Sequence, residues 1–351
     1  MPITMTRRGP TRNLVTGGMG FIGSHLAGKL LDQGQQVTVL DDLSTGRFEH
    51  IRPLTGNPRF QYVVANINDE TVVDRLVGES DVVYHLAAAV GVKLIMDDAV
   101  RTIETNVAGT EAILRAALRH KAKVLVASTS EVYGKGARFP FNEEDDVVLG
   151  ATTHHRWAYA ASKMVDEFLA LAYFSQKGLP VVVFRLFNTV GPGQTGHYGM
   201  VVPRLVQQAL RGEALTVYGD GQQSRCFLHV FDAVHAIMGL AACPDAVGQV
   251  FNVGSTEEVT ILELAKRVLH AVDLVTANGQ RGGPATIGAP DPRMTFMPYD
   301  QVYGAGFEDM PRRLPDVAKI NQYIGWRAEL TLDDILRDVI KSFTLPEASV
   351  A

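Results

Sequence analysis

Tyr159 and Lys163 stand four residues apart in the segment YAASK, at the start of a stretch with helical periodicity. This spacing puts both side chains on one face of a helix. A tyrosine with the ordinary pKa of about 10 is a poor base at neutral pH, but an adjacent ammonium group stabilises the phenolate and lowers that pKa. The pair is therefore a candidate base for a sugar or alcohol hydroxyl. The same spacing also occurs in solvated pairs on surface helices.

The stretch STSEVYG, residues 128–134, offers a second set of reactive side chains. It follows the apolar run KVLVA, which predicts a buried strand, so we expect Thr129, Ser130 and Glu131 where that strand opens into a loop. Two hydroxyls and a carboxylate at such a place can hold a substrate oxygen and move its proton. Glu131 has a second interpretation as an exposed acid at the end of a strand.

The segment TGGMGFIGS carries Gly17, Gly20 and Gly23 with the spacing of a dinucleotide-binding turn. Glycine lets such a turn tighten and lets a diphosphate approach the backbone, while the following helix N-terminus favours negative charge. The next predicted strand ends in Asp41 and Asp42. A carboxylate there accepts hydrogen bonds from ribose hydroxyls and repels a 2′-phosphate, so the pattern favours NAD over NADP. The alternative is that the glycines serve only a tight turn.

The elements that must position these residues alternate along the first half of the chain. Short β-branched runs such as NLVTG, QVTVL and DVVYHL are separated by amphipathic segments of helical length. This alternation is typical of a doubly wound parallel sheet, so we predict an α/β Rossmann-like fold. We place the NAD-binding Rossmann domain at residues 1–188, with residues 226–256 returning to it. Residues 189–351 are expected to form a smaller C-terminal substrate-binding lobe.

Composition and charge argue against several classes of protein. The net charge of −5 is spread along the sequence, which indicates no basic face for nucleic acid or an anionic membrane. No apolar segment approaches the roughly 20 residues that span a bilayer, and the first residues lack the apolar core of a signal peptide. Cys226 and Cys243 lack metal-site spacing, and His154 and His155 lack further ligands. We therefore expect no metal and a cytoplasmic protein.

Seven segments, taken in order, resemble signatures of the extended short-chain dehydrogenase/reductases that act on nucleotide sugars. They are TGGMGFIGS, HLAA, STSEVYG, YAASK, RLFNTVGPG, LTVYGDGQQSRCFLHVFD and FNVGS, and together they cover nearly the whole chain. The resemblance implies a Rossmann domain that binds NAD and a C-terminal lobe that binds a nucleotide diphosphate. It implies Tyr159 as the base, Lys163 as its partner and Thr129 as a hydrogen-bond donor to the reacting oxygen.

The same resemblance implies further binding residues. Besides the residues already named, those expected to contact NAD are Phe21, Ile22, Asn66, Ile67, Leu86, Ala87 and Ala88. Those expected to contact the nucleotide sugar, most often a UDP-sugar, are Lys93, Asn188, Val202, Arg225 and Arg313. Asn188 has an alternative interpretation as a turn cap and Arg225 as a solvated loop residue. Arg312 stands beside Arg313, so charge alone does not select between them.

Ser130 and Glu131 narrow the set of reactions that the resemblance allows. Enzymes of this kind usually oxidise the sugar at C4, and the 4-epimerases typically have no acid in this stretch. The 4,6-dehydratases carry Asp-Glu, but Ser130 takes the place of that aspartate and a serine hydroxyl is too weak an acid to replace it. Thr-Ser-Glu is similar to the UDP-glucuronate decarboxylases. In those enzymes a C4 ketone makes the C6 carboxylate leave as CO2, and an acid such as Glu131 is expected to return a proton to C5.

Two distant segments point to the same group of enzymes. RWAYAASK, with Arg156 and Trp157, and YGAGFEDMPRRLPD, residues 303–316, resemble the decarboxylase domain of the lipid A aminoarabinose pathway and the UDP-apiose/xylose synthases. Lys93 departs from this pattern, because a lysine there is more typical of 4-epimerases. We predict decarboxylation of UDP-glucuronate or a related NDP-hexuronate to a UDP-pentose or 4-keto-pentose. The alternative is NDP-sugar 4-epimerisation, of the UDP-glucose or UDP-glucuronate type.

A function of another class is a non-catalytic NAD sensor with the same fold. Tyr159 and Lys163 are both present, which argues against this class. The apolar faces of residues 102–119 and 159–174 are of the kind that the family pairs across a dimer. We therefore predict a homodimer, although these faces are equally able to pack on their own sheet.

Overall fold

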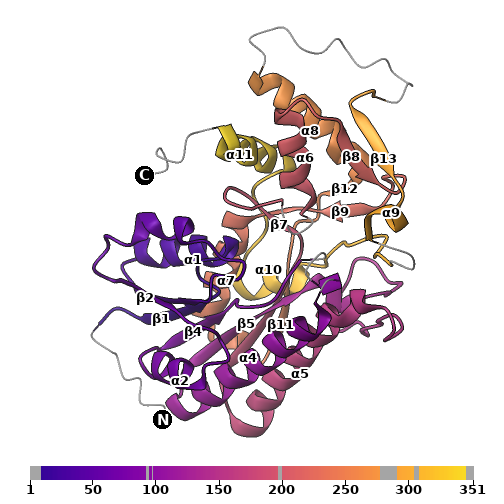
Figure 1. The fold of residues 1–351 in the computed structure, drawn as a ribbon. Helices are drawn as coiled ribbons and strands as arrows, with labels where there is room; N and C mark the ends of the chain where they lie inside the picture. The colour runs from indigo at the N-terminus through magenta and orange to yellow at the C-terminus, as the bar shows by residue number, and fades with distance from the viewer. Residues whose placement is uncertain are drawn as a thin grey trace.

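A sheet of seven parallel strands forms the larger lobe of the molecule (Figure 1). The structure is a computed structural model and describes residues 9–91, 95–96, 98–196, 200–276, 291–303 and 308–344. From edge to edge the strands are β11 (Val250–Val253), β6 (Val181–Leu186), β5 (Lys123–Thr129), β4 (Val82–His85), β1 (Arg12–Thr16), β2 (Gln36–Asp41) and β3 (Phe60–Val64). Every pairing between them is parallel, which confirms the predicted doubly wound fold.

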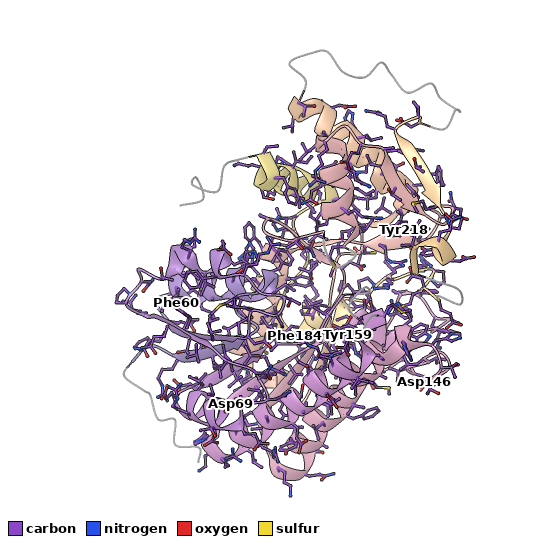
Figure 2. All side chains as sticks on the ribbon, viewed as in Figure 1. Phe60, Asp69, Asp146, Tyr159, Phe184 and Tyr218 are labelled. Atoms are coloured by element: carbon purple, nitrogen blue, oxygen red, sulfur yellow. The ribbon has the colours of Figure 1, made fainter. Side chains whose placement is uncertain are left out.

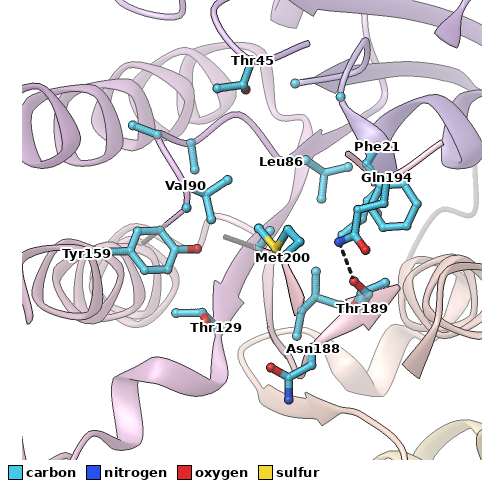
Figure 3. A pocket seen from close by; sticks show the side chains of 18 of the residues that line it. Phe21, Thr45, Leu86, Val90, Thr129, Tyr159, Asn188, Thr189, Gln194 and Met200 are labelled. Carbon is cyan, nitrogen blue, oxygen red and sulfur yellow. Dashed lines mark hydrogen bonds between the residues drawn. The ribbon is translucent and has the colours of Figure 1, made fainter. Parts of the chain in front are cut away.

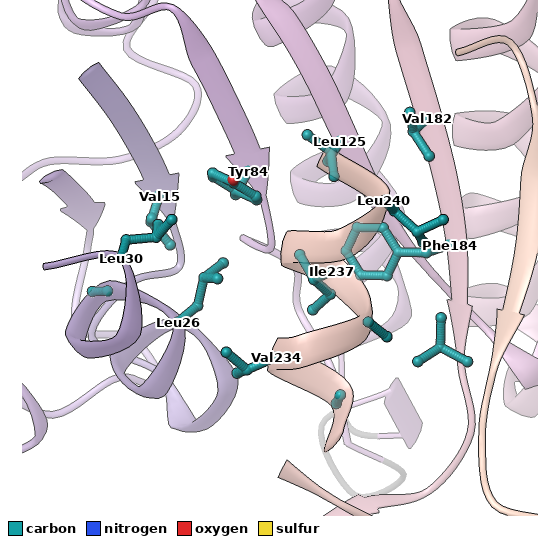
Figure 4. Packing of buried hydrophobic residues seen from close by; sticks show 14 of the residues in the cluster. Val15, Leu26, Leu30, Tyr84, Leu125, Val182, Phe184, Val234, Ile237 and Leu240 are labelled. Atoms are coloured by element: carbon teal, nitrogen blue, oxygen red, sulfur yellow. The ribbon is translucent and has the colours of Figure 1, made fainter. Parts of the chain in front are cut away.

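Helices cover both faces of this sheet. One face carries α1 (Phe21–Asp32), α7 (Val230–Ala242) and α10 (Ala318–Ile324), and the other carries α2 (Glu70–Gly78), α4 (Ala99–His120) and α5 (Ala158–Lys177). Neighbouring strand residues point to opposite faces, so Val15 joins the first layer and Leu14 the second. Figure 4 shows the first layer, where Leu26 of α1 and Ile237 of α7 pack with the strand residues.

The two long helices α4 and α5 lie side by side along the sheet (Figure 1). The Asp98 side chain caps α4 by accepting a hydrogen bond from the backbone N–H of Arg101, and α5 ends at Gly178 in the left-handed region. Because α5 begins at Ala158, Tyr159 and Lys163 fall in its first turns. No helix in the described ranges is long and apolar enough to cross a membrane.

The smaller lobe has an apolar core of its own, in which Leu205, Val268 and Leu336 are fully buried. Its helices are α6 (Val201–Leu210), α8 (Ile261–Thr276), α9 (Tyr299–Tyr303) and α11 (Leu332–Thr344). Its strands pair as β8 (Leu215–Tyr218) with β13 (Met294–Met297) and β9 (Ser224–Cys226) with β12 (Glu258–Thr260). A short pair, β7 (Thr189–Val190) with β10 (Leu228–His229), precedes the return of the chain to the main sheet as α7 and β11.

Candidate functional site

A cavity of about 460 Å³ opens at the carboxyl edge of the sheet, where the smaller lobe faces it. Residues after β1, β2, β4, β5 and β6 line one side, and residues of α6, β8 and the segment around Asp309 line the other. Figure 2 places Tyr159 near the middle of the molecule, and Figure 3 shows the cavity from close by. Ligands of open α/β sheets bind at this edge.

The glycine-rich turn between β1 and α1 forms one end of the cavity. Gly17 has a φ of +67°, and a Cβ added to it would lie 2.8 Å from the backbone nitrogen of Ala87. A Cβ on Gly23 would lie 2.3 Å from the carbonyl oxygen of Gly17. The turn therefore brings β1, β4 and α1 together more closely than side chains allow, and it exposes the helix N-terminus to the cavity. These residues fit the diphosphate of a dinucleotide.

Two carboxylates, the last residue of β2 and the one after it, lie at the same end of the cavity. Asp41 is buried and accepts hydrogen bonds from the backbone N–H groups of Met19, at 3.0 Å, and Leu43, at 2.8 Å. Burial raises the pKa of Asp41 above its ordinary value, and these two donors oppose the rise. Asp42 is exposed and accepts a 2.9 Å hydrogen bond from the amide of Asn66. Both acids line the cavity, as a ribose site requires.

Most of the residues expected to bind a ligand line this cavity. Those expected at NAD that do so are Gly17, Gly20, Phe21, Ile22, Gly23, Asp41, Asp42, Ile67, Leu86, Ala87, Ala88, Tyr159 and Lys163. Those expected at the sugar that do so are Thr129, Ser130, Glu131, Asn188, Arg225 and Arg313.

Three expected residues are placed differently. The Asn66 side chain is turned to Asp42, and Asn66 is not part of the cavity lining. Val202 is wrong as a lining residue, because it is fully buried in the core of the smaller lobe, while Val201 and Pro203 beside it line the cavity. Lys93 lies outside the described residues.

Tyr159 is buried and directs its hydroxyl into the cavity, with Thr129 nearby (Figure 3). Burial raises the pKa of Tyr159, and the charges of Glu131 and Asp166 act in the same direction, whereas a hydrogen bond with Thr129 opposes them. The expected lowering by Lys163 is therefore wrong for this structure. The Lys163 ammonium donates to the Asp166 carboxylate over 2.8 Å, and both side chains are buried. Lys163 is thus held by an acid of its own helix.

Thr129 and Ser130 stand where β5 ends, as expected. The Thr129 hydroxyl oxygen accepts a 3.2 Å hydrogen bond from the backbone N–H of Glu131, and the same hydroxyl forms the hydrogen bond with Tyr159. Ser130 is buried beside the cavity. Asn188, after β6, lines the cavity while its amide donates to the carbonyl of Cys226 at 3.0 Å.

Glu131 is a buried carboxylate held by two arginines. Its Oε2 accepts a hydrogen bond from Arg156 Nη1, and its Oε1 accepts one from Arg313 Nη1 at 3.2 Å. Burial alone would raise the pKa of Glu131, but the charges and hydrogen bonds of Arg156 and Arg313 outweigh it and lower the pKa to about 2. The carboxylate is therefore ionised at neutral pH. The expected return of a proton to C5 by Glu131 stays a prediction, and it would require this carboxylate to gain a proton first.

Asp309 extends this ionic cluster across the cavity. It lies 2.7 Å from Arg225, 3.3 Å from Arg313 and 3.8 Å from Arg156. The sequence singled out the segments that contain Arg156 and Asp309 but not these residues as members of the site. Their motifs gave that signal, but Glu131 lies 25 residues from Arg156 and Arg225 lies 84 residues from Asp309, so the sequence does not bring these partners together.

Comparison with known proteins agrees with this geometry. The family model described as GDP-mannose 4,6 dehydratase matches residues 14–339. The chain belongs to this family. The predicted membership of the extended short-chain dehydrogenase/reductases is thereby confirmed.

The GDP-mannose 4,6-dehydratase family includes decarboxylases among the relatives of this chain. This chain is 42% identical to the UDP-N-acetyl-alpha-D-glucosaminuronate decarboxylase of Bacillus cytotoxicus, over 95% of this chain and 97% of that protein. It is 35% identical to UDP-glucuronic acid decarboxylase 1 of Danio rerio, over 95% of this chain and 72% of that protein. A solved structure of the dTDP-glucose 4,6-dehydratase DesIV of Streptomyces venezuelae, with NAD and TYD bound, is similar with a TM-score of 0.81 and 29% identity, covering 95% and 96% of the two chains. These relatives are enzymes, as predicted.

Alanine at Gly17 tests the dinucleotide turn. We expect Gly17→Ala to weaken NAD binding by at least about tenfold, because the added methyl group displaces the backbone of β4 and the turn. Isothermal titration calorimetry measures the affinity. Gly178→Ala is the matched control, since Gly178 also has positive φ but open space around its Cβ position. It should cost roughly 1–2 kcal/mol of stability without changing NAD affinity. Equal NAD affinities of the two variants would contradict the assignment.

The Glu131 carboxylate predicts a pH-dependent stability. Its pKa of about 2 lies below the ordinary value of 4.5, so its ionisation stabilises the fold above about pH 4.5, and this contribution is lost as the pH falls toward 2. Urea unfolding should show Glu131→Gln less stable than the parent by up to about 3 kcal/mol at pH 7, with the difference shrinking below pH 4.5. Glu213→Gln, at an exposed position, is the control. A difference that stays constant from pH 7 to pH 3 would rule out the ionised state.

Proposed function

We propose that the chain is an NAD-dependent enzyme that decarboxylates a UDP-hexuronate after oxidation at C4. The observation that carries this proposal is the charge balance beside the catalytic tyrosine. Arg156, Arg225 and Arg313 contribute three positive charges, and Glu131 and Asp309 contribute two negative ones, which leaves a net charge of +1 in the cluster. A buried excess charge calls for an anion, and a UDP-hexuronate would supply two, the diphosphate beside Arg225 and the carboxylate beside Arg156 and Arg313. The sugar of a neutral UDP-hexose would place no charge at the second position.

The fit of NAD rests on the turn and the carboxylates already described. DesIV, a structural relative with the same fold, has NAD bound. Asp41 and Asp42 would bind the hydroxyls of the adenosine ribose and repel a 2′-phosphate. NAD bound there supplies the hydride acceptor that turns the C4 hydroxyl of the sugar into a ketone.

As a phenolate, Tyr159 would take the proton of the C4 hydroxyl, and Thr129 would donate a hydrogen bond to the same oxygen. Burial opposes formation of this phenolate by raising the pKa of Tyr159, and the positive charge of oxidised NAD bound beside it would favour it. The carboxylate β to the C4 ketone would then leave as CO2, and the negative charge would move to the C4 oxygen, where Thr129 and the now neutral Tyr159 donate hydrogen bonds. Water that enters the cavity would supply the proton that C5 needs. Lys163 is fixed by the Asp166 carboxylate and lines the same cavity.

Glu131 has a different part in this proposal from the one that the sequence suggested. As an anion it cannot protonate C5, but it holds Arg156 and Arg313 at the sugar end of the cavity. Ser130 supplies a hydroxyl where a dehydratase needs an acid, so loss of the C6 substituent as hydroxide is disfavoured. Epimerisation of a neutral UDP-hexose at C4 would use the same tyrosine but would have no use for the positive charge at the sugar, whereas a uronate 4-epimerase would use both.

NMR of the purified protein tests this function. With catalytic NAD and UDP-sugars labelled with ¹³C at C6, we expect the carboxylate signal to disappear and bicarbonate to form. The relative with 42% identity acts on the N-acetylated uronate, so UDP-N-acetylglucosaminuronate should react at least as fast as UDP-glucuronate. Tyr159→Phe should reduce the rate by at least about 100-fold, because it removes the base. A retained carboxylate with inverted C4 would identify an epimerase, and two intact substrates would refute the proposal.

We also propose that the enzyme is a homodimer formed through α4 and α5. These adjacent helices expose Val100, Ile103, Val165 and Phe168, and the side chain of Phe168 is 66% accessible. Contiguous exposed apolar residues on a helix pair favour association with a second copy.

Phe168→Asp tests this dimer. Light scattering coupled to size exclusion should give twice the chain mass for the parent at micromolar concentration and a monomer for the variant, because a buried charge in the interface has no partner. Phe296→Asp, an exposed phenylalanine on β13 of the smaller lobe, should remain dimeric. A monomeric parent would refute the dimer.

The cytoplasm is the location that we propose, because Cys226 and Cys243 are both free thiols, as in a reducing compartment. Cytoplasmic nucleotide sugars would then be directly accessible as substrates. We expect no nucleic acid or membrane partner.

A further inference from the structure

We propose that Asp309 is a positioning residue that divides its carboxylate between Arg225 and Arg313 and so links the diphosphate part of the cavity to the sugar part. This inference rests on the proposed function, which puts a nucleotide diphosphate at Arg225 and a uronate near Arg313. In this role Asp309, an acid inside an anion-binding cavity, competes with the substrate for the N–H donors of the arginines.

Both oxygens of Asp309 are engaged. Oδ2 accepts a hydrogen bond from Arg225 Nη2 at 2.7 Å. Oδ1 accepts one from Arg313 Nη2 at 3.3 Å and one from the backbone N–H of Met310 at 2.8 Å, and it lies 3.8 Å from Arg156. The side chain lines the cavity and is 22% exposed, so it is accessible to a ligand.

The segment that carries Asp309 is clamped on both sides. Glu308 turns away from the cavity and accepts hydrogen bonds from Lys135 at 2.7 Å and Trp157 at 2.8 Å. Arg312 forms two hydrogen bonds with Glu258, at 2.6 and 2.7 Å. These contacts fix the backbone independently of Asp309, so its carboxylate is free to act on the arginines rather than to hold the segment.

The positive charges of Arg225 and Arg313 explain why an acid is useful at position 309. Arg225 is buried, and its burial together with the nearby charge of Arg313 lowers the pKa of Arg225 to about 10. Asp309 offsets this repulsion and holds the two guanidinium groups in one arrangement. A diphosphate that reaches Arg225 must compete with Asp309 for its N–H donors, which weakens nucleotide binding. Asp309 then keeps its contact with Arg313, which lies next to Glu131 and beside the position proposed for the uronate.

Removal of this charge should therefore change binding and turnover in opposite directions. In the NAD-loaded enzyme, Asp309→Asn should bind UDP at least about threefold more tightly by isothermal titration calorimetry, because the competing anion is gone. Its kcat on the uronate should fall at least about tenfold, because Arg225 and Arg313 lose their common partner. Asp309→Glu should recover part of kcat. A residue that only holds the segment would give weaker UDP binding when replaced.

Glu213→Gln is the control, since it removes the same charge at an exposed position outside the cavity lining. It should change the affinity for UDP by less than about twofold. UDP binding by Asp309→Asn that is equal to or weaker than that of the parent would overturn the proposal, as would an unchanged kcat. If the proposed function is wrong, the result is different: the parent enzyme binds UDP but leaves the uronate intact. The UDP affinities then still decide the role of Asp309.

Discussion

The buried carboxylate of Glu131 imposes the constraint on which the sugar end of the cavity depends. An ionised group taken out of water costs several kcal/mol unless charges and hydrogen bonds compensate it. The compensation comes from two arginines. Arg156 stands just before α5, and Arg313 stands 182 residues after Glu131 in the chain. This contact can form only when β5, α5 and the late segment meet. The ion pairs therefore bring the late segment against the sheet at the place where Tyr159 lies.

Features that depend on a few neighbouring residues could be predicted from the sequence. The alternation of strands and helices specified the parallel sheet, since β-branched runs and amphipathic stretches each determine their own local structure. Gly17 and Gly23 marked a turn that only glycine fits, and Asp41 followed at the end of the next strand. The reactive groups of β5 and α5 were found for the same reason, because strand ends and helix starts locate them.

Features that depend on tertiary packing could not be predicted in the same way. Asp166 and Tyr159 both lie within four residues of Lys163 on one helix, and only the burial of the Lys163–Asp166 pair shows which contact forms. Asp309 and Arg225 meet across the cavity, so the residues next to one of them in the sequence do not indicate that the other is its partner. Val202 illustrates a rotational error, since each helical residue turns by about 100° and the neighbours of Val202 face the cavity while it faces the core.

In the proposed decarboxylation, the ionised state of Glu131 would affect how charge moves. Before reaction, the negative charge of a uronate would balance the positive charge of Arg156 and Arg313 that Glu131 leaves uncompensated. Loss of CO2 would transfer that negative charge to the C4 oxygen, where Thr129 and the neutral Tyr159 would donate hydrogen bonds. A neutral, protonated Glu131 would leave the cluster with a larger positive charge and favour retention of the uronate. Fixed as an anion, Glu131 weakens the hold of Arg156 and Arg313 on the departing carboxylate. An acid that cannot give a proton therefore still favours the reaction, because it limits the electrostatic stabilisation of the ground state.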